Sequence, residues 1–404
     1  MIRQLFHRLF AHRHFWREVS FSEMSEIYIS MMFRSLSVSL TSIFIPLYML
    51  KLDYSFLEII TLFFWYFVFR ALIFDYIAGY MTAKLGPKHT ILYSYGLLTL
   101  STLLFLTLGH VTWPVWLLAA LWGGSTSLFT IPFSVDFSKV KNKAHSGKEL
   151  GYVNVIEKFG GIAGPIIGGV IATFFGGQYI FIVSIFLLVL GGMTLLRTSE
   201  PTQTGQDFSL RYLPYRRMKR DLVAMSAYGI ELTMGAWVWA LYLAIFVLAS
   251  ATAYAQMGAL ASLSVVMAMV TAYGIGKLID KRKGRILLRS GAILNAGLHF
   301  IRPFVTVFPM ALLVNVVNEG VSIAYRMPFI KGFYDAADEH PGQRIAYCTA
   351  MELIASFTKV VVWGFLVILA QFLAPYPITV IGFIIAGLAS LAIMAERFKA
   401  LDAK

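Results

Sequence analysis

Long apolar stretches recur along the whole chain, and short polar segments separate them. A helix needs about 20 mostly apolar residues to span a membrane, and twelve stretches come close to or exceed that length. They lie near residues 26–50, 55–81, 90–109, 114–135, 150–175, 178–196, 222–248, 252–276, 286–307, 309–330, 346–372 and 376–395. The pattern predicts an all-α membrane protein with twelve transmembrane helices, arranged as six, a polar break and six.

The composition agrees with this pattern. The 404 residues are 58% hydrophobic and only 14% charged, whereas a soluble globular domain carries about 25% charged residues. So few charged side chains cannot cover the surface of a soluble body of this size. The composition therefore excludes a soluble multidomain protein and indicates that lipid surrounds most of the chain.

The positive charges are distributed unevenly between the two sides of the predicted membrane. The net charge is +13, from 34 Lys and Arg against 21 Asp and Glu. With the N-terminus inside, 27 of the 34 cations fall on inner segments, one (Lys51) falls in an outer loop, and six lie within the helices. Because Lys and Arg accumulate in cytoplasmic loops, we expect a cell (inner or plasma) membrane protein with both termini cytoplasmic. The basic excess then requires no nucleic-acid partner.

The same pattern divides the chain into five parts. An amphipathic cytoplasmic segment (1–25) precedes a six-helix bundle (26–196), and a basic cytoplasmic linker (197–221) leads to a second six-helix bundle (222–395) and a cytoplasmic tail (396–404). In the first segment, apolar residues at helical spacing oppose Arg and His, which is typical of a helix lying flat on an anionic membrane face. A frayed tail is the alternative.

The two halves carry the marks of an internal repeat. The segment GKELGYVNVIE ends at Glu157 and the segment GQRIAYCTAME ends at Glu352, so that Gly, Tyr and Glu coincide at an offset of 195. Pro132 and Pro328 correspond at an offset of 196, and Arg34 and Glu231 at 197. Two six-helix repeats with a site between them at the membrane midplane are a plan of secondary transporters.

Glycines and cations mark the inner loops that follow the second and eighth predicted helices. In these loops glycine allows a tight turn, and an acid can stabilise a helix N-terminus and pair with cations. The residues are Gly79, Lys84, Gly86 and Lys88 in the first loop, and Gly276, Asp280, Lys281, Gly284 and Arg285 in the second. With the repeat, they resemble the inner-loop signature of the major facilitator superfamily (MFS), which implies the MFS fold of two pseudo-symmetric six-helix bundles.

In that family the signature latches the outward-open state from the cytoplasmic side. The first loop departs from it, because Ala83 stands where the family has an acid. Asp75, one helical turn before Gly79, is expected to take its place. The alternative is that both loops are only positively charged turns.

The fifth predicted helix contains a run of small residues with a proline. Gly160, Gly161, Gly164, Pro165, Gly168 and Gly169 resemble the family's motif for exchangers that couple efflux to inward protons. Small residues at this spacing allow another backbone to approach closely, and the proline bends the helix. The resemblance implies a drug/proton-antiporter-like exporter, and a packing seam without influence on the direction of transport is the alternative.

Polar and charged side chains occur inside the predicted helices, where each charge costs about 2.5–3.5 kcal/mol to insert. Steps of three and four residues place several of them on one helical face, which must point into protein or water. The candidates for substrate binding and coupling are Arg34, Glu157, Glu231, Asn315, Glu319, Arg326, Glu352 and Lys359.

We expect different roles for these residues. Glu319, near the middle of its helix beside Asn315, is the first candidate to carry a proton or read the substrate, with Arg326 as an alternating partner. Arg34 and Glu231 are expected to pair between the halves, either as a state-dependent gate or as a permanent ion pair. Glu157 and Glu352 either form fixed bridges to Lys158 and Lys359 or function in transport.

Further polar residues are expected at the two ends of the helices. Arg70, Asp75 and Asp136 are interpreted as latch or packing elements on the cytoplasmic side. His299 and Arg302, near the outer end of the ninth helix, are expected to face the rim. An aromatic wall of an amphipathic-substrate cavity is predicted from Trp237, Trp239 and Tyr242.

These observations predict a secondary active transporter working by alternating access, and no enzyme. The single Cys348 excludes an internal disulfide, and no Cys/His spacing indicates a metal site. No phosphate-binding Gly-rich loop is present, and we expect no cofactor. The expected chemistry is proton-coupled export of a small amphipathic compound by a monomer, with the substrate, protons and membrane lipid as partners. The alternatives are a lipid or lysolipid flippase, a nutrient symporter, or a non-transporting sensor or scaffold.

Overall fold

The structure is a computed structural model that describes residues 23–140, 160–161, 163–196, 208–248, 252–280, 284–340, 342–398 and 401. For residues 23–28, 136–140 and 272–280 it describes the backbone alone. Throughout this part of the chain the regular elements are helices. Ten helical stretches are long and apolar enough to cross a membrane, and Ala163–Phe174 is a shorter apolar helix. The prediction of an all-α membrane protein is confirmed.

The N-terminal half contains five long helical stretches and the shorter helix Ala163–Phe174. Two of the stretches combine several elements: α3 with α4, and α5 with η1 and α6. The elements are α3 (Glu23–Thr41), α4 (Ile45–Lys51), α5 (Phe56–Phe69), the π-helix η1 (Arg70–Phe74), α6 (Asp75–Leu85), α7 (Pro87–Leu106), α8 (Val115–Val140) and α10 (Gln178–Leu195).

The C-terminal half repeats this plan. Its first stretch runs without a break through α11, η2, α12 and η3. The elements are α11 (Tyr215–Thr233), η2 (Met234–Val238), α12 (Trp239–Tyr242), η3 (Leu243–Val247), α13 (Ala253–Asp280), α14 (Gly284–Ile301), η4 (Arg302–Phe304), α15 (Phe308–Asp338), α16 (Arg344–Leu369), α17 (Pro375–Ala392) and η5 (Ile393–Ala395).

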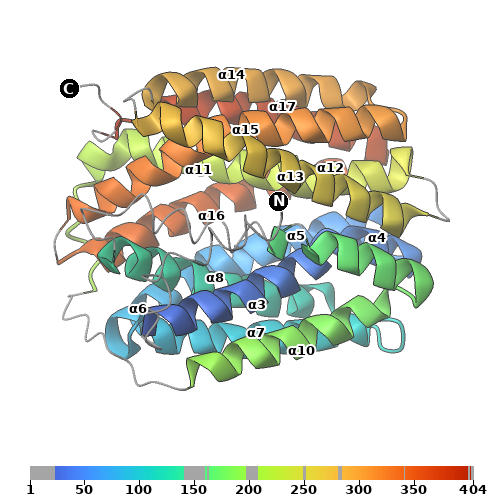
Figure 1. Cartoon of the computed structure of the whole chain (residues 1–404), viewed down its shortest axis with the longest axis horizontal. Coiled ribbons are helices and arrows are strands. Elements are labelled where there is room, and N and C mark those ends of the chain that lie inside the picture. The colour runs from blue at the N-terminus through green and yellow to red at the C-terminus, as the bar shows by residue number, and fades with distance from the viewer. Residues whose placement is uncertain are drawn as a thin grey trace, which may run out of the picture.

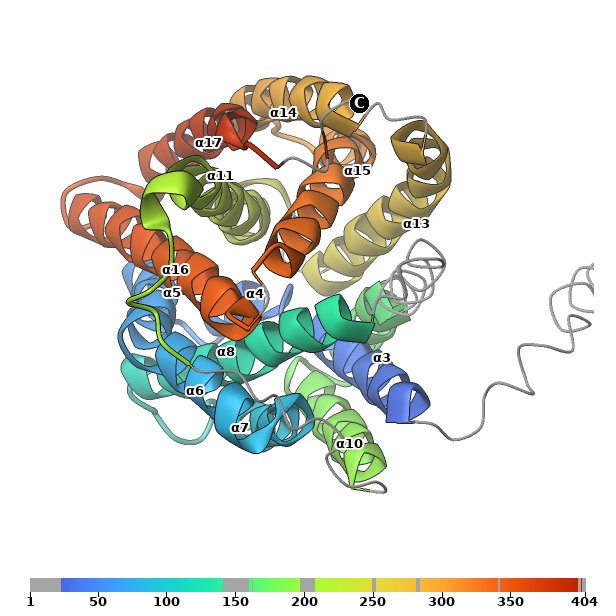
Figure 2. The same cartoon turned by 90° about the vertical axis from the view of Figure 1, so that its left-hand side faces the viewer.

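The two halves lie against each other as two groups of roughly parallel helices (Figure 1). Viewed from one end, α11 and α13 to α17 form one group, and α3, α5 to α8 and α10 form the other (Figure 2). The helix α16 packs along α5, η1, α6 and α8, so it forms much of the boundary between the halves. Pro132 and Pro328, matched by the repeat, lie inside the equivalent helices α8 and α15.

The seventh helix begins earlier than the hydropathy pattern predicts. We placed the linker at 197–221 and the second bundle from 222, but α11 begins at Tyr215. Pro214 occupies the N-cap position, and the first turns expose basic side chains while Met218 is buried. An amphipathic start of this kind lowers the local hydropathy without interrupting the helix, which explains the difference of seven residues.

The turn between α6 and α7 depends on one glycine. Gly86 has a φ of 90°, in the left-handed region that L-residues with a side chain seldom adopt. Pro87 then begins α7, where its fixed φ and missing N–H are tolerated. This sharp reversal places the C-terminal end of α6 beside the start of α7.

Candidate functional site

A buried ion pair joins the two halves. Arg70 Nη2 donates to Glu352 Oε2 of α16 at 3.1 Å, and Arg70 Nε lies 3.4 Å from Asp75 Oδ1. Ser127 of α8 donates to the same Asp75 oxygen at 2.5 Å. Arg70 and Asp75 are 5% and 0% exposed. Because leaving one member of a buried ion pair without its partner is costly, this network makes a specific contact between the halves.

The π-helix η1 explains why Arg70 and Asp75 can share a partner. In an α-helix, residues five positions apart lie on different faces. In η1 the Asp75 N–H bonds to the Arg70 carbonyl, and this i→i+5 bond widens the turn. Both side chains then point toward Ser127 and α16.

Lys359 lies two turns beyond Glu352 on α16. It is 5% exposed, and its ammonium lies over the Phe67 ring, 4.8 Å from the centroid. The Lys359 side chain packs against Gly229 of α11. A larger residue at that position would crowd it, since a Cβ there would lie 3.2 Å from Lys359 Cε. The fixed Glu352–Lys359 bridge is therefore not formed, because Glu352 pairs across the boundary with Arg70.

A second buried network lies entirely within the C-terminal half. Glu231 of α11 is 1% exposed. Its carboxylate accepts hydrogen bonds from Asn295 Nδ2 at 2.9 Å, His299 Nε2 at 3.2 Å and the Tyr325 hydroxyl at 2.5 Å. Arg326 Nε in turn donates to the Tyr325 hydroxyl at 3.2 Å. Three donors from two further helices thus satisfy one buried carboxylate.

The partners of His299 determine which of its ring nitrogens carries a proton. Arg302 Nη1 lies 3.0 Å from His299 Nδ1, and a guanidinium can only donate. Nδ1 is therefore the acceptor, and Nε2–H faces Glu231. Arg302 also donates to the Gly235 carbonyl at 3.1 Å and to Asn318 Oδ1 at 3.2 Å.

The expectation that His299 and Arg302 face the rim is wrong. They are 0% and 1% exposed. Arg302 begins the short 3-10 helix η4, which follows α14, and both Arg302 and Pro303 are buried. Asn295, His299 and Arg302 are spaced by four and three residues on one helical face, and this polar stripe was the signal in the sequence.

The expected Arg34–Glu231 pair is also not formed. Arg34 is 6% exposed and stays within its own half, with its guanidinium carbon 4.1 Å from the centre of the Phe129 ring. Its Nη2 lies 3.4 Å from the Ser125 carbonyl. Equivalence within the repeat does not bring the two residues together, because the partners of Glu231 belong to its own half.

The helix α15 presents Asn315, Glu319 and Arg326 on one side. Asn315 accepts a 2.5 Å hydrogen bond from Trp239 Nε1. Glu319 is half-buried and lies within electrostatic range of Arg302 and Arg326. The spacing of seven residues places Glu319 and Arg326 two turns apart on one face, as an alternating pair requires.

Gly79, expected in the first inner loop, lies inside α6 and allows a close contact between the halves. A Cβ at Gly79 would collide with Thr349 Oγ1 of α16 and come 2.7 Å from the Phe208 ring. Lys84 is exposed, whereas Lys88 is 4% exposed. Asp75, expected to replace the missing acid at Ala83, bonds to Arg70 and Ser127. Asp75 is thus linked through Arg70 to Glu352 of the other half, and a latch role of these residues stays a prediction.

Two residues of the second inner loop bind the C-terminal segment. Arg285 Nε lies 3.2 Å from Glu396 Oε1, and its Nη2 donates to the Phe398 carbonyl at 3.0 Å. A Cβ at Gly284 would lie 3.1 Å from Leu401. These contacts with the C-terminal segment lie within the C-terminal half, and a role of Gly284 and Arg285 in gating stays a prediction. Gly276 lies inside α13.

Several expected residues fall outside the described part. They are the segment 1–22, Glu157, Lys158 and Lys281, together with the side chains of Asp136 and Asp280.

Aromatic rings pack between the halves near the charged residues. Trp237 of η2 stacks on Phe63, Phe67 and Trp122 of the N-terminal half, with ring centroids 4.5, 5.4 and 5.4 Å apart. Trp239 and Tyr242 instead stack on each other within the C-terminal half. Of the three predicted wall residues, Trp237 is thus the one that these ring contacts place at the boundary.

The sequence model of the Major Facilitator Superfamily matches residues 27–330. The chain belongs to this family. An uncharacterized MFS-type transporter of Methanocaldococcus jannaschii is 21% identical over 287 residues, which cover 68% of this chain and 73% of that protein. The E. coli fucose:proton symporter FucP has a similar fold, with a TM-score of 0.63 and 14% identity over 92% of this chain and 96% of the other. A structure of FucP in the outward conformation has a TM-score of 0.62 and 15% sequence identity, over 92% of this chain and 98% of that chain.

Membership of this family makes the chain a multi-pass membrane transporter rather than an enzyme.

In this MFS protein the small residues of the fifth helix form two stripes. A Cβ at Gly160, Gly164 or Gly168 would collide with α3 or Phe44, within the same half. Gly161 and Gly169 instead face α13 of the other half, where Gly169 Cα lies 3.2 Å from a Cβ built on Gly258. The motif thus contributes packing both inside one half and between the halves.

Proposed function

We propose that this MFS protein is a secondary active transporter that exports a small amphipathic organic compound in exchange for protons, by alternating access. The observation that carries the proposal is the buried Arg70–Glu352 ion pair between the halves. Any movement that separates α16 from η1 must break this pair and leave a carboxylate without its cation. Protonation of Glu352 lowers the cost of that step, because a neutral acid is less costly to leave unpaired.

The other charges have separate roles in this proposal. Arg70 keeps Asp75 as a partner when Glu352 is protonated, so the N-terminal half retains a compensated charge. Glu319 reads the substrate or carries the coupling proton, with Arg326 as its alternating partner, and Glu157 is a further candidate for substrate binding or coupling. Glu231 stays paired and holds α11, α14 and α15 together as one body.

Three further features bear on the direction of transport, the kind of substrate and the membrane location. The resemblance of Gly161, Gly164, Pro165, Gly168 and Gly169 to the family's exchanger motif supports antiport, and the close packing of its glycines on α3 and α13 is equally compatible with a purely structural seam. Trp237 between the halves suits an amphipathic or aromatic substrate. The distribution of Lys and Arg supports a location in the cell (inner or plasma) membrane with both termini cytoplasmic, and we propose that the protein acts there as a monomer.

The test uses everted vesicles that contain the full chain and hold an imposed proton gradient, acidic inside. Addition of an exported cation or amphiphile should dissipate the gradient as protons leave. The substitution Glu352→Gln should abolish this response, whereas Glu339→Gln, the same change at an exposed residue, should retain it. If no compound in a broad panel dissipates the gradient, antiport is wrong. A sugar that moves protons in the same direction as itself would instead support symport.

A further inference from the structure

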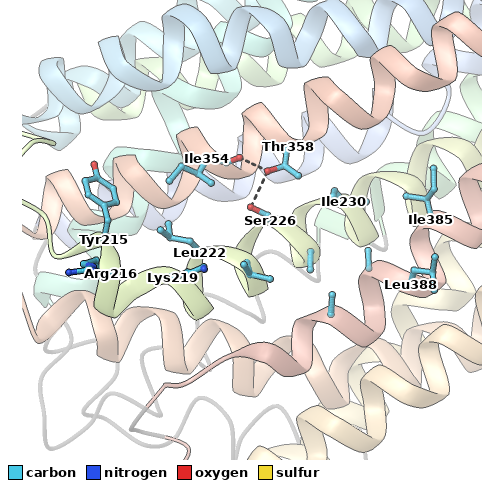
Figure 3. A pocket seen from close by; sticks show the side chains of 14 residues that line it. Tyr215, Arg216, Lys219, Leu222, Ser226, Ile230, Ile354, Thr358, Ile385 and Leu388 are labelled. Carbon is cyan, nitrogen blue, oxygen red and sulfur yellow. Dashed lines mark hydrogen bonds between the residues drawn. The ribbon is translucent and has the colours of Figure 1, made fainter.

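A groove on the outside of the C-terminal half lies away from both charge networks. It has a volume of about 830 Å³, with α11 as its floor and α16 and α17 as its walls (Figure 3). Val223 and Leu388 line it and are 46% and 57% exposed, so it opens to the surroundings of the bundle. In a transmembrane protein, those surroundings are lipid.

The groove is apolar beyond its first helical turn, and the hydroxyls of its middle part have partners. Thr358 Oγ1 lies 3.1 Å from Ser226 Oγ and 2.8 Å from the Ile354 carbonyl. A hydrocarbon chain lying there would leave no new polar group unsatisfied. The lining therefore favours an acyl chain over a polar solute.

Positive charge lies at one end of the groove. Arg216 and Lys219 line it where α11 begins, and both are exposed (Figure 3). They are three residues apart on one helical face, and the neighbouring Arg217 and Arg220 are not among the residues that line the groove. The other end is closed by Ile230 and Ile385. Such a site is basic at one end and apolar at the other.

The length of the groove matches one leaflet. From Tyr215 to Ile230 the helix rises about 22 Å at 1.5 Å per residue. Half of a bilayer, including its headgroup region, is about 20–22 Å thick. The cations thus lie at headgroup level while the isoleucines lie near the bilayer midplane.

We propose that this groove binds one anionic phospholipid from the leaflet on the linker side. The lipid phosphate lies between Arg216 and Lys219, and one acyl chain follows Val223, Ala227 and Ile230 along α11. The volume falls within the range of about 300–1,000 Å³ usual for ligand pockets. Because all the lining residues belong to the C-terminal half, the site persists when the halves move, and it does not depend on the proposed antiport.

Native mass spectrometry of the detergent-solubilised full chain tests the proposal, with phosphatidylglycerol or phosphatidylcholine of the same acyl chains. Phosphatidylglycerol should bind more tightly. A basic residue near an anionic headgroup contributes about 1 kcal/mol, so Arg216→Gln with Lys219→Gln should weaken binding about 30-fold. The matched control, Arg217→Gln with Arg220→Gln, should weaken it less than about threefold. Val223→Trp, which fills the exposed part of the groove, should weaken it about tenfold.

The proposal is overturned if both Gln pairs weaken binding equally, since the effect would then be a diffuse surface charge. It is also overturned if Val223→Trp binds like the wild type, or if phosphatidylcholine binds as tightly as phosphatidylglycerol. Displacement of the lipid by equimolar glycerol phosphate would identify a site for small anions and would likewise overturn it.

Discussion

Arg70 and Glu352 are 282 residues apart in the chain, yet Arg70 Nη2 lies 3.1 Å from Glu352 Oε2. One belongs to the π-helix η1 of the N-terminal half and the other to α16 of the C-terminal half. The side chain of Glu352 is 12% exposed, whereas that of Arg70 is 6% exposed. The carboxylate is thus the member of the pair that protons reach more easily.

Loss of the guanidinium should destabilise the closed structure strongly. Arg70→Met would leave both Asp75 and Glu352 without their cation, and breaking a buried pair in this way costs about 3–5 kcal/mol. Thermal unfolding in detergent should show a clearly lower midpoint. The double variant Arg70→Met with Glu352→Gln should recover part of the loss, because only Asp75 then remains uncompensated. Additive effects of the two substitutions would contradict a direct pair.

The hydroxyl of Tyr325 should stabilise the second network. Tyr325→Phe removes a hydrogen bond to the buried Glu231 carboxylate and should lower the free energy of unfolding by about 1.5–3 kcal/mol. Tyr376→Phe is the matched control, because its hydroxyl bonds to the Pro303 carbonyl at 3.2 Å from a position that is 45% exposed. Its effect should stay below about 1 kcal/mol. Equal shifts in the unfolding midpoint would show that Glu231 gains nothing from Tyr325.

The sequence predicted the helices far better than it predicted the contacts between them. Hydropathy places the helices because each must span lipid, and the repeat matches α8 with α15 through Pro132 and Pro328. The contacts of Glu352 could not be predicted in this way. Arg70 and Asp75 share a partner only because η1 is a π-helix, and Arg70 meets Glu352 only because α16 packs on η1.

The second network shows a signal that hydropathy alone misses. Asn295, His299 and Arg302 form a polar stripe on an otherwise apolar helix, and Asn318 and Tyr325 complete it from α15. We assigned His299 and Arg302 to the rim from their distance along the helix. That distance did not reveal that Arg302 is buried, because its position depends on partners from distant parts of the chain, the Gly235 carbonyl of η2 and Asn318 of α15.

The contact between the fifth helix and α13 should be sensitive to a single methyl group. A Cβ at Gly258 would lie 2.5 Å from the Pro165 carbonyl, so Gly258→Ala should destabilise this packing by about 1–3 kcal/mol. Gly297→Ala is the control, because nothing lies within 4 Å of its Cβ position. There alanine should raise the stability of the helix by about 0.5–1 kcal/mol. The midpoint of thermal unfolding should therefore fall for Gly258→Ala and rise for Gly297→Ala. A rise or a fall in both variants would argue against the close contact.

Cys348 should report separation of the halves on the side where α6 meets α16. It is the single cysteine of the chain, is fully buried, and precedes Thr349, which contacts Gly79. Gly79→Ala would push Thr349 and Phe208 away from α6, and weakening this contact by about 1–2 kcal/mol should raise the rate of maleimide labelling about 5- to 30-fold. The control Gly96→Ala, where nothing lies within 4 Å, should label at the wild-type rate. Equal rates in both variants would mean that Gly79 does not hold the halves together.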